Sequence, residues 1–419
     1  MKKLFRHALA ATGLINLLCG FAAAGAMETD PQTGHVVKHL SKDLCSEGRG
    51  FYFHQDPFSD NRTMFFKGHT NKKDGAGWRL YTVNLETGQG GQFWKSDTHS
   101  YETIGKKRQE LFYFTPASDG LHGEIRAIQL RTKTERVVTA GLPFENLRGV
   151  NLTLNADETL LATAYAEHLG DYFDKYTRNE RWAAFAKLGL TNHILTISVD
   201  TGVARDIYQT NAWLGHVQFS PTDSNLLEFC REISFIADPV KDRMWLLRAD
   251  GTGLGRPFPQ RPDIDMVTHE FWSPSGKHLL FDAHLLHVSG KNYFGSVDVA
   301  RWQAAKAEPT RAAGAGIPVK PWERLWSIPT WSFHFNAAHS GELFCGDGSA
   351  RDGVKGCWVW VYRPQADGTL VAEKIFNMEK HDYKRCEPNV HFDPSDKWVI
   401  FTYNGGGKDE VMAVSVDKP

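Results

Sequence analysis

The sequence lacks the motifs of several common classes of enzyme and binding protein. It contains no GxSxG, no P-loop, no HExxH and no CxxC pair. Serine hydrolases, P-loop nucleotide-binding proteins and cysteine-cluster metal sites therefore lose support. The chain has 48 Lys+Arg against 49 Asp+Glu, a formal net charge of -1, and no long basic run. Because proteins bind nucleic acid largely by neutralising phosphates, we do not expect a nucleic-acid partner.

Cysteine is scarce, with six residues in 419. Cys19 lies in the N-terminal leader, so a processed chain would keep five thiols, and an odd number cannot all form disulfides. Cys345 and Cys357 flank a glycine-rich segment. The sequence leaves open whether these two form a disulfide across a hairpin or remain buried free thiols.

The N-terminus has the pattern of a secretory signal peptide. Lys2, Lys3 and Arg6 precede an apolar stretch from residue 8 to 24, and the stretch ends in small residues up to Ala26. This order of basic, apolar and small residues predicts a signal peptide over residues 1–26. Polar and glycine interruptions argue against an uncleaved anchor. We therefore expect a mature chain of residues 27–419 that is periplasmic or secreted, with no membrane span after cleavage.

A turn-and-strand pattern recurs along the mature chain. Each copy has an aromatic or apolar residue, a polar turn with Ser, Pro or Asp, and an apolar strand. The clear copies begin at Phe219, Trp272 and Phe392. Weaker copies begin near Phe58, Leu154 and Ala337, and a degenerate one lies around residues 107–114. Successive copies start roughly 45–65 residues apart. Repeats of about this length, each with several short strands, are typical of β-propeller blades.

The repeats predict an all-β fold, a seven-bladed β-propeller that forms a single domain over residues 27–419. An aromatic content of 12% and 38 glycines suit many short strands joined by tight turns. Residues 78–88 and 194–202 are predicted further strands of the blades, since apolar residues alternate and then stop at a glycine turn. Residues 172–190 are the exception and predict a short helical insertion in a middle blade.

Several histidines lie next to the blade turns. His216, His269 and His334 each lie three residues before the start of a turn motif. Propellers bind ligands where loops of several blades converge at one end of the channel, so these side chains would point at a common axis. Such a set suits a metal or acid/base site. Any one of them alone is as readily explained as a half-buried turn residue.

The last blade offers oxygen and nitrogen donors. Glu387, Asn389 and His391 alternate by two, so a strand would project all three from one face, as a ligand set for Mn or Ca. Two alternatives stay open. In the first, His391 lies at the start of the predicted strand and packs inside the protein instead of binding a metal. In the second, His381 or Asp382 upstream takes the place of one of the three ligands.

Arg243 lies in an otherwise apolar segment, Asp242-Arg-Met-Trp245. A buried arginine needs an anion, either a protein carboxylate or the carboxylate of a substrate. Pairing with Asp238 or Asp242 and binding of a substrate are equally consistent with the sequence.

At these positions the chain resembles the oligogalacturonate lyases, seven-bladed propellers that cleave short pectin fragments. The resemblance covers nearly the whole mature chain. It is carried by Phe51-Tyr-Phe-His-Gln55, residues 81–88 and 212–216, Phe229-Cys-Arg-Glu232 with residues 242–245, Thr268-His-Glu-Phe-Trp272, and Gly346-Asp-Gly348. The resemblance implies a catalytic base at His269, an essential arginine at Arg243, and a metal, usually Mn, bound by His334 and the last blade.

The last blade departs from the family's pattern of a glutamine followed by His-Pro-His-Pro-Ser-Phe. Two of the histidine ligands are replaced by Glu387 and Asn389, and the glutamine by Lys384. The expected ligand set is therefore His334, Glu387, Asn389 and His391, with Mn ahead of Ca. Arg231 also replaces a family histidine. Both changes point to another acidic oligosaccharide as an alternative substrate.

The implied reaction is β-elimination on an acidic oligosaccharide. A base removes the C5 proton of a uronate, and Arg243 with a divalent metal stabilises the charge that develops on its carboxylate. His216, His54 and Gln55 are candidates for contacts with the sugar. The alternative from another class is a propeller without catalytic activity that docks proteins in the periplasm. Convergence of His269, Arg243 and His334 in one site would separate the two.

Overall fold

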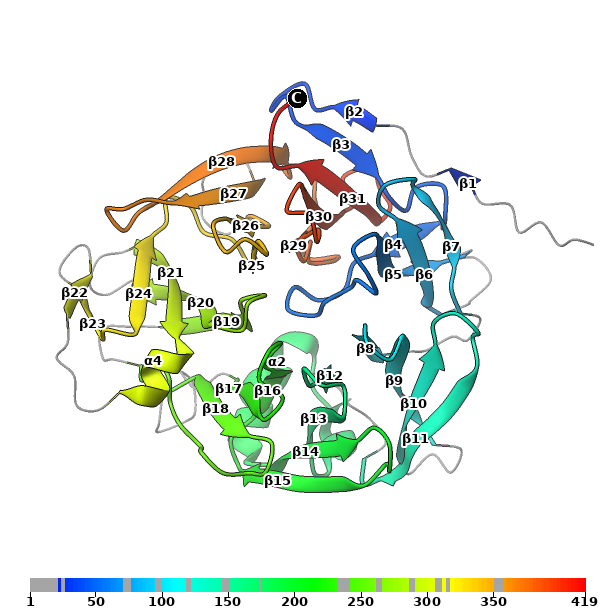
Figure 1. Ribbon diagram of the computed structural model, residues 1–419, viewed down its shortest axis with the longest axis vertical. Coiled ribbons are helices and arrows are strands. Elements are labelled where there is room, and N and C mark those ends of the chain that lie inside the picture. Colours follow the sequence, from blue (N-terminus) through cyan, green and yellow to red (C-terminus); the bar gives the residue numbers. More distant parts are fainter. Residues whose placement is uncertain are drawn as a thin grey trace, which may run out of the picture.

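Seven β-sheets surround a central axis in this computed structural model, as the blades of a β-propeller (Figure 1). The structure describes residues 22–23, 27–70, 77–94, 100–117, 122–144, 151–173, 175–232, 242–260, 266–285, 291–305, 311–313, 317–349 and 357–419. The predicted all-β, seven-bladed architecture is confirmed.

The first three blades follow one another along the chain, with antiparallel neighbouring strands. Their strands are β4 (Glu47–Arg49), β5 (Thr63–His69), β6 (Arg79–Asn84) and β7 (Gln89–Gln92), with β1 (Ala22–Ala23) at the edge; β8 (Ser100–Gly105), β9 (Glu110–Pro116), β10 (Gly123–Gln129) and β11 (Glu135–Leu142); and β12 (Thr153–Leu154), β13 (Leu160–Ala166), β14 (Asn192–Ser198) and β15 (Ala204–Thr210).

The next three blades repeat this order. Their strands are β16 (Leu214–Phe219), β17 (Leu226–Arg231) and β18 (Met244–Arg248); β19 (Met266–Trp272), β20 (His278–Leu285), β21 (Lys291–Asp298) and β24 (Glu323–Ser327); and β25 (Phe335–Ala337), β26 (Phe344–Gly346), β27 (Trp358–Pro364) and β28 (Leu370–Asn377). The strands predicted over residues 78–88 and 194–202 are β6 and β14.

The seventh blade closes the ring with strands from both ends of the chain. It contains β29 (His391–Phe392), β30 (Trp398–Tyr403) and β31 (Glu410–Ser415), followed by β3 (Val36–His39) and β2 (Met27–Thr29). Val37 of β3 pairs with Val414 of β31, and both side chains are buried. The first strands after the predicted signal peptide therefore complete the last blade.

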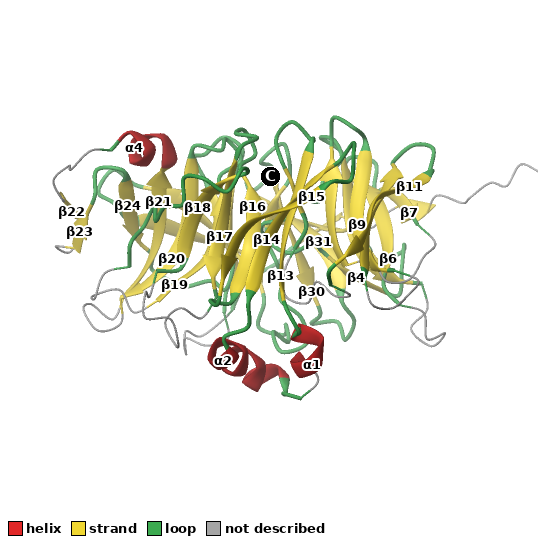
Figure 2. Cartoon of the chain, turned by 90° about the horizontal axis from the view of Figure 1, so that it is seen from below, coloured by secondary structure: helices red, strands yellow, loops and turns green. Residues whose placement is uncertain are grey.

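The helical insertion lies between β13 and β14, as the sequence predicted. It consists of α1 (Leu169–Phe173) and α2 (Arg178–Leu188), which project from one face of the propeller (Figure 2). A further helix, α4 (Val299–Ala304), and the hairpin of β22 (Arg311–Ala313) and β23 (Ile317–Val319) extend from the fifth blade. Among the described residues, no helix has the length and apolar character that a membrane span requires.

The repeated turn motif has a hydrogen-bonding cause. The residue after the aromatic is Ser220, Ser273 or Asp393, and its side-chain oxygen accepts hydrogen bonds from amides later in the same turn. In the last blade, Oδ1 of Asp393 accepts from the amides of Lys397 (2.8 Å) and Trp398 (2.7 Å). Such side chains stabilise the tight turn before the next strand, which explains why the motif recurs.

The hydrophobic core is divided among the spaces between neighbouring blades. One buried cluster joins the fourth and fifth blades through residues such as Leu246 and Phe281, and another joins the sixth and seventh through Val361 and Phe401. The five cysteines of residues 27–419 are all free thiols. Cys345 and Cys357 therefore do not form the disulfide that the sequence left open.

Candidate active site

Three residues at or just before the innermost strands of their blades have left-handed backbone conformations. The φ angles of His216, His269 and Asn389 are 47°, 50° and 54°. Each residue lies three positions before the aromatic of its turn motif, and the two histidines lie in register shifts against the next strand. Bulges of this kind redirect side chains, and left-handed residues other than glycine concentrate at functional sites. The equivalent ends of these blades therefore form the candidate site.

The site lies on the face from which α1 and α2 project (Figure 2). Trp213 immediately precedes β16, and its ring packs against Phe185 of α2 with ring centroids 4.9 Å apart. The beginnings of the innermost strands therefore lie near the face from which α1 and α2 project (Figure 2). The turn motifs lie at the other ends of the same strands.

A phenylalanine from the first blade occupies the centre of this site. The loop between β4 and β5 reaches into the middle of the ring (Figure 1). Its Phe53 is fully buried and stacks on His334, with centroids 4.8 Å apart and planes at 24°. The same ring makes edge contacts with His269 at 5.9 Å and His216 at 6.1 Å. Phe53 is thus an apolar support shared by three histidines from three blades.

Side chains of the last two blades hold this loop in place. The amide of Phe53 donates to Oδ1 of Asn389 (3.2 Å), and its carbonyl accepts from Nδ2 of Asn336 (3.1 Å). Nε2 of His391 lies 3.2 Å from the carbonyl of Tyr52 and 3.0 Å from that of Gln55, and so donates to them. These contacts fix the loop through its backbone.

Two residues predicted as metal ligands therefore bind this loop. Asn389 also donates to the backbone carbonyl of Glu387, at 3.1 Å. The expectation that Glu387, Asn389 and His391 project from one face of a strand is wrong, because β29 begins only at His391 and the left-handed Asn389 breaks the alternation. His391 is 3% exposed, which matches the packed alternative.

The buried arginine is paired with a glutamate that the sequence did not single out. Nε of Arg243 donates to Oε2 of Glu270 at 2.6 Å, and Nη2 lies 3.4 Å from Oε1. Nη1 donates to Glu232 at 3.1 Å. Arg243 is 5% exposed and Glu270 fully buried. A bidentate pair of this kind holds the guanidinium plane in one orientation.

Of the two carboxylates considered as partners for Arg243, Asp242 is excluded. Asp242 binds Arg256 (2.6 Å) and the amide of Gln260 (2.5 Å) instead, because the chain turns its side chain away from Arg243. Asp238 lies outside the described residues. Arg243 itself immediately precedes β18.

Glu270 also binds a histidine from the neighbouring blade. Nδ1 of His216 lies 2.7 Å from Oε1 of Glu270, and Nε2 lies 3.6 Å from Glu232. Burial alone would raise the pKa of Glu270, but the charges of Arg243 and His216 outweigh it and hold the pKa well below its ordinary value. Glu270 is therefore ionised. Burial, together with the charge of Glu270, raises the pKa of the nearby Glu228 well above its ordinary value.

His269 is oriented by a buried aspartate. Its Nδ1 lies 3.0 Å from Oδ1 of Asp282, which is fully buried and also binds His284 (2.8 Å) and Thr268 (2.7 Å). Burial lowers the pKa of His269 despite the opposing effect of Asp282. The neutral ring then donates from Nδ1 to the carboxylate and leaves the lone pair of Nε2 free, as a general base requires.

His334 has a similar carboxylate partner. Its Nδ1 lies 2.7 Å from Asp347, and its Nε2 faces Oε2 of Glu387 at 4.0 Å. The ring of His334 is 4.9 Å from that of His269. Metal-binding histidines usually donate their second nitrogen to a carboxylate in this way. The free nitrogen of His334 and the carboxylate of Glu387 thus fit a divalent cation with mixed nitrogen and oxygen ligands.

A second group of potential ligands fits a cation less well. Donor atoms of His216, Cys230 and Glu270 lie within 4.8 Å of one another. Both oxygens of Glu270 already face Arg243, whose positive charge opposes a cation at this place. Burial also raises the pKa of the Cys230 thiol well above its ordinary value, so a thiolate ligand is unfavourable there.

The remaining candidates for sugar contacts have different environments. His54 lies against His216, with ring centroids 5.0 Å apart, and burial followed by the charge of His216 lowers its pKa well below its ordinary value. Gln55 uses its amide group within the protein, since it accepts from the amide of Tyr52 (3.3 Å) and donates to the carbonyl of Glu102 (3.2 Å). His216 is 9% exposed, and its Nδ1 is bound to Glu270.

Sequence reasoning missed the carboxylates that position the site. Glu270 and Asp347 lie in segments already singled out, Thr268-His-Glu-Phe-Trp272 and Gly346-Asp-Gly348. Glu270 directly follows His269, and Asp347 lies just after β26, where its amide pairs with the carbonyl of His334. Proximity to the chosen histidines is the available signal. Asp282 lies opposite Thr268 on β20, and no local pattern marks it.

The fold and the site together define a β-propeller with an enzyme-type centre. An oriented neutral histidine, a buried arginine and paired carboxylates converge at one end of the channel, which a surface for protein docking does not require. The oligogalacturonate lyase family model (Pectate_lyase22) matches residues 26–310. The chain belongs to the oligogalacturonate lyase family.

Individual relatives agree with this assignment. The chain is 29% identical over 416 residues to the oligogalacturonate lyase of Dickeya dadantii, covering 92% of this chain and 95% of that protein. It is 26% identical over 258 residues to the oligogalacturonide lyase of Pectobacterium atrosepticum. That match spans 56% of this chain and 59% of the relative.

Two solved structures share the fold. An oligogalacturonate lyase in complex with manganese has a TM-score of 0.75 at 23% identity, covering 94% of this chain and 97% of that one. An oligogalacturonate lyase from Vibrio parahaemolyticus also has a TM-score of 0.75, at 22% identity, covering 94% and 96%. These similarities establish the architecture of the whole propeller.

Removal of the glutamate that neutralises Arg243 should destabilise the protein strongly. We expect Glu270→Ala to lower the free energy of unfolding by about 3–5 kcal/mol, because it leaves a buried charge without its main partner. Glu86→Ala is the matched control, since Glu86 forms an exposed ion pair with Arg62, and we expect a change below about 1 kcal/mol. Urea unfolding of both variants measures the difference. Equal effects would contradict the structural role of Glu270.

Proposed function

We propose that this chain cleaves short oligogalacturonides by metal-assisted β-elimination and gives an unsaturated uronate product. The observation that carries the proposal is the convergence of His269, His334 and Arg243 around the loop of Phe53. The ring centroids of His269 and His334 are 4.9 Å apart. The ring of Tyr52 lies 5.3 Å from that of His334 and 5.6 Å from that of His216. His216 in turn binds Glu270, the partner of Arg243. The names of the relatives support the substrate class.

His269 would act as the base. Its free Nε2 takes the proton from C5 of a uronate, while Asp282 holds the ring and favours the charged form that results. The electrons of the C5–H bond form the C4–C5 double bond, and the bond from C4 to the bridging oxygen breaks. That oxygen takes a proton from solvent, so the reaction needs no oxidant and no organic cofactor.

Arg243 would bind the carboxylate of the reacting uronate. Three of its five N–H groups face Glu270 and Glu232, which leaves one on each terminal nitrogen. The pair with Glu270 fixes the plane of these remaining donors. A guanidinium oriented before substrate arrives stabilises the charge that builds on the carboxylate during proton removal.

His334 and Glu387 would hold the divalent metal. When bound, the metal supplies positive charge that lowers the energy of the developing enolate-like dianion. The nitrogen and oxygen donors suit Mn better than thiophilic metals, with Ca as the alternative. The fold relative solved with manganese supports this choice. Asn389 and His391 would support the site indirectly, through the loop that carries Phe53.

The last blade favours a second candidate substrate. Glu387 adds a negative charge where the family pattern has a neutral histidine, which changes the balance of charge around a bound carboxylate. A lyase that acts on another uronate-containing glycan is therefore the alternative. The N-terminal pattern supports export, so we also propose that the enzyme acts in the periplasm or outside the cell.

Absorbance in the near ultraviolet tests the reaction. We expect purified protein to raise it when mixed with digalacturonate or trigalacturonate, because elimination creates a conjugated double bond. Chelation should abolish the rise, and added Mn should restore it. No rise with any galacturonate oligomer and any metal would contradict the proposed substrate, and other uronate glycans would then be assayed in the same way.

His269→Ala should remove activity and preserve the fold. We expect kcat to fall at least about 100-fold, the usual contribution of a positioned general base. The melting temperature should change little. His168→Ala is the control, because His168 is an exposed histidine near α1. Initial rates and thermal unfolding check both variants. A folded His269→Ala protein with full activity would exclude this base.

A further inference from the structure

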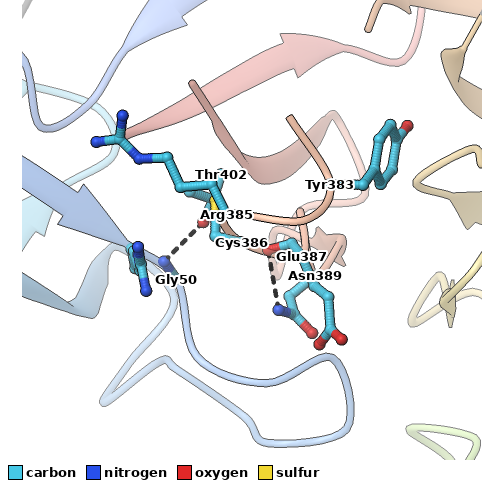
Figure 3. A pocket seen from close by; sticks show the side chains of 8 residues that line it. Gly50, Tyr383, Arg385, Cys386, Glu387, Asn389 and Thr402 are labelled. Carbon is cyan, nitrogen blue, oxygen red and sulfur yellow. Dashed lines mark hydrogen bonds between the residues drawn. The ribbon is translucent and has the colours of Figure 1, made fainter. Parts of the chain in front are cut away.

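A cavity of about 210 Å³ adjoins the candidate active site (Figure 3). It shares Glu387 and Asn389 with that site, and its other lining residues come from the first and seventh blades. The complete lining is Arg49, Gly50, Tyr383, Arg385, Cys386, Glu387, Asn389 and Thr402. Sites that hold drug-sized ligands span roughly 300–1,000 Å³, so this cavity suits a smaller unit such as one sugar residue.

Two arginines line the cavity, and one of them is fully engaged. Nη2 of Arg385 donates to Glu47 at 2.6 Å, and Nη1 donates to the carbonyl of Gly407 at 2.9 Å. Its Nε lies 2.8 Å from Asp409. Every nitrogen of Arg385 thus has a protein acceptor, and we assign it a structural role.

Arg49 is held in place but keeps its terminal nitrogens available. Its Nε donates to the buried Asp409 at 2.5 Å, and its guanidinium lies over the ring of Trp78, 4.7 Å from the centroid. Among the residues that the structure describes, no acceptor binds its two terminal nitrogens. The side chain is 35% exposed. A guanidinium fixed in this way presents two parallel donors, the arrangement that binds a carboxylate.

The charges near the cavity place an anion at the Arg49 end. Asp409 is shared between Arg49 and Arg385, and Glu47 faces Arg385, so these two carboxylates are already paired. Glu387 lies at the end near His334, where the proposed metal would engage its carboxylate, which leaves Arg49 as the lining cation available to a uronate. A uronate in the cavity would therefore direct its carboxylate toward Arg49 and its hydroxyl groups toward Glu387 and Asn389.

We propose that Arg49 binds the carboxylate of a second uronate unit, next to the unit that reacts at Arg243 and His269. This inference rests on the proposed function, because it extends the bound oligosaccharide from the reacting unit across Glu387 into the cavity. The cavity then makes the enzyme selective for chains with consecutive acidic sugars. Arg49 acts in recognition and takes no part in proton transfer.

Calorimetric titration of trigalacturonate into His269→Ala protein, loaded with Mn, tests this site without turnover. We expect Arg49→Ala in that background to raise the Kd at least about 10-fold, because a charge-assisted hydrogen bond pair is lost. Arg49→Lys should recover only part of the affinity, since a point charge lacks the fork. Arg62→Ala, at an exposed arginine paired only with Glu86 among the described residues, is the control and should leave the Kd unchanged.

A second ligand separates recognition of the carboxylate from a general effect on the loop. A trisaccharide with methyl esters on all units except the reacting one should bind Arg49→Ala and Arg49-containing protein equally. An unchanged Kd for trigalacturonate in Arg49→Ala, or equal weakening of both ligands, would overturn the proposal. Failure of the proposed function is distinguished by absorbance, because wild-type protein would then show Arg49-dependent binding without elimination.

Discussion

The buried ion pair between Arg243 and Glu270 is the interaction on which the site depends. The pair joins the fourth and fifth blades. Glu270 binds Arg243 through Oε2 and His216 through Oε1. Glu270 follows His269 within the same bulge, so the carboxylate that fixes the guanidinium also fixes the backbone that presents the base. Breaking such a pair leaves an uncompensated buried charge, so we expect the loss of either partner alone to destabilise the fold strongly.

The loop between β4 and β5 of the first blade completes the site at the centre of the ring (Figure 1). Phe53 supports three histidine rings, while Asn336, Asn389 and His391 bind the loop backbone. Asn389 and His391, which the sequence predicted as metal ligands, thus anchor this loop. What remains for a metal is the pair of His334 and Glu387, and the same glutamate borders the cavity of Arg49.

Much of the fold and part of the site could be predicted from the sequence. Blade turns repeat because each needs a side chain that accepts from its own amides, so the pattern is local and visible. His216, His269 and His334 share one offset from that pattern, which identified the channel end. Glu270, Asp282 and Asp347 were missed because their partners come from other strands or blades. Strand alternation failed at Asn389, where a left-handed residue interrupts the strand.

Anomalous diffraction from crystals of His269→Ala protein, soaked with Mn and trigalacturonate, tests the central claim most directly. The account predicts a manganese peak bound by His334 and Glu387, with a uronate carboxylate on the two remaining donors of Arg243 and the Arg243–Glu270 pair intact. Manganese at His216 and Cys230, or a carboxylate bound without contact to Arg243, would contradict it.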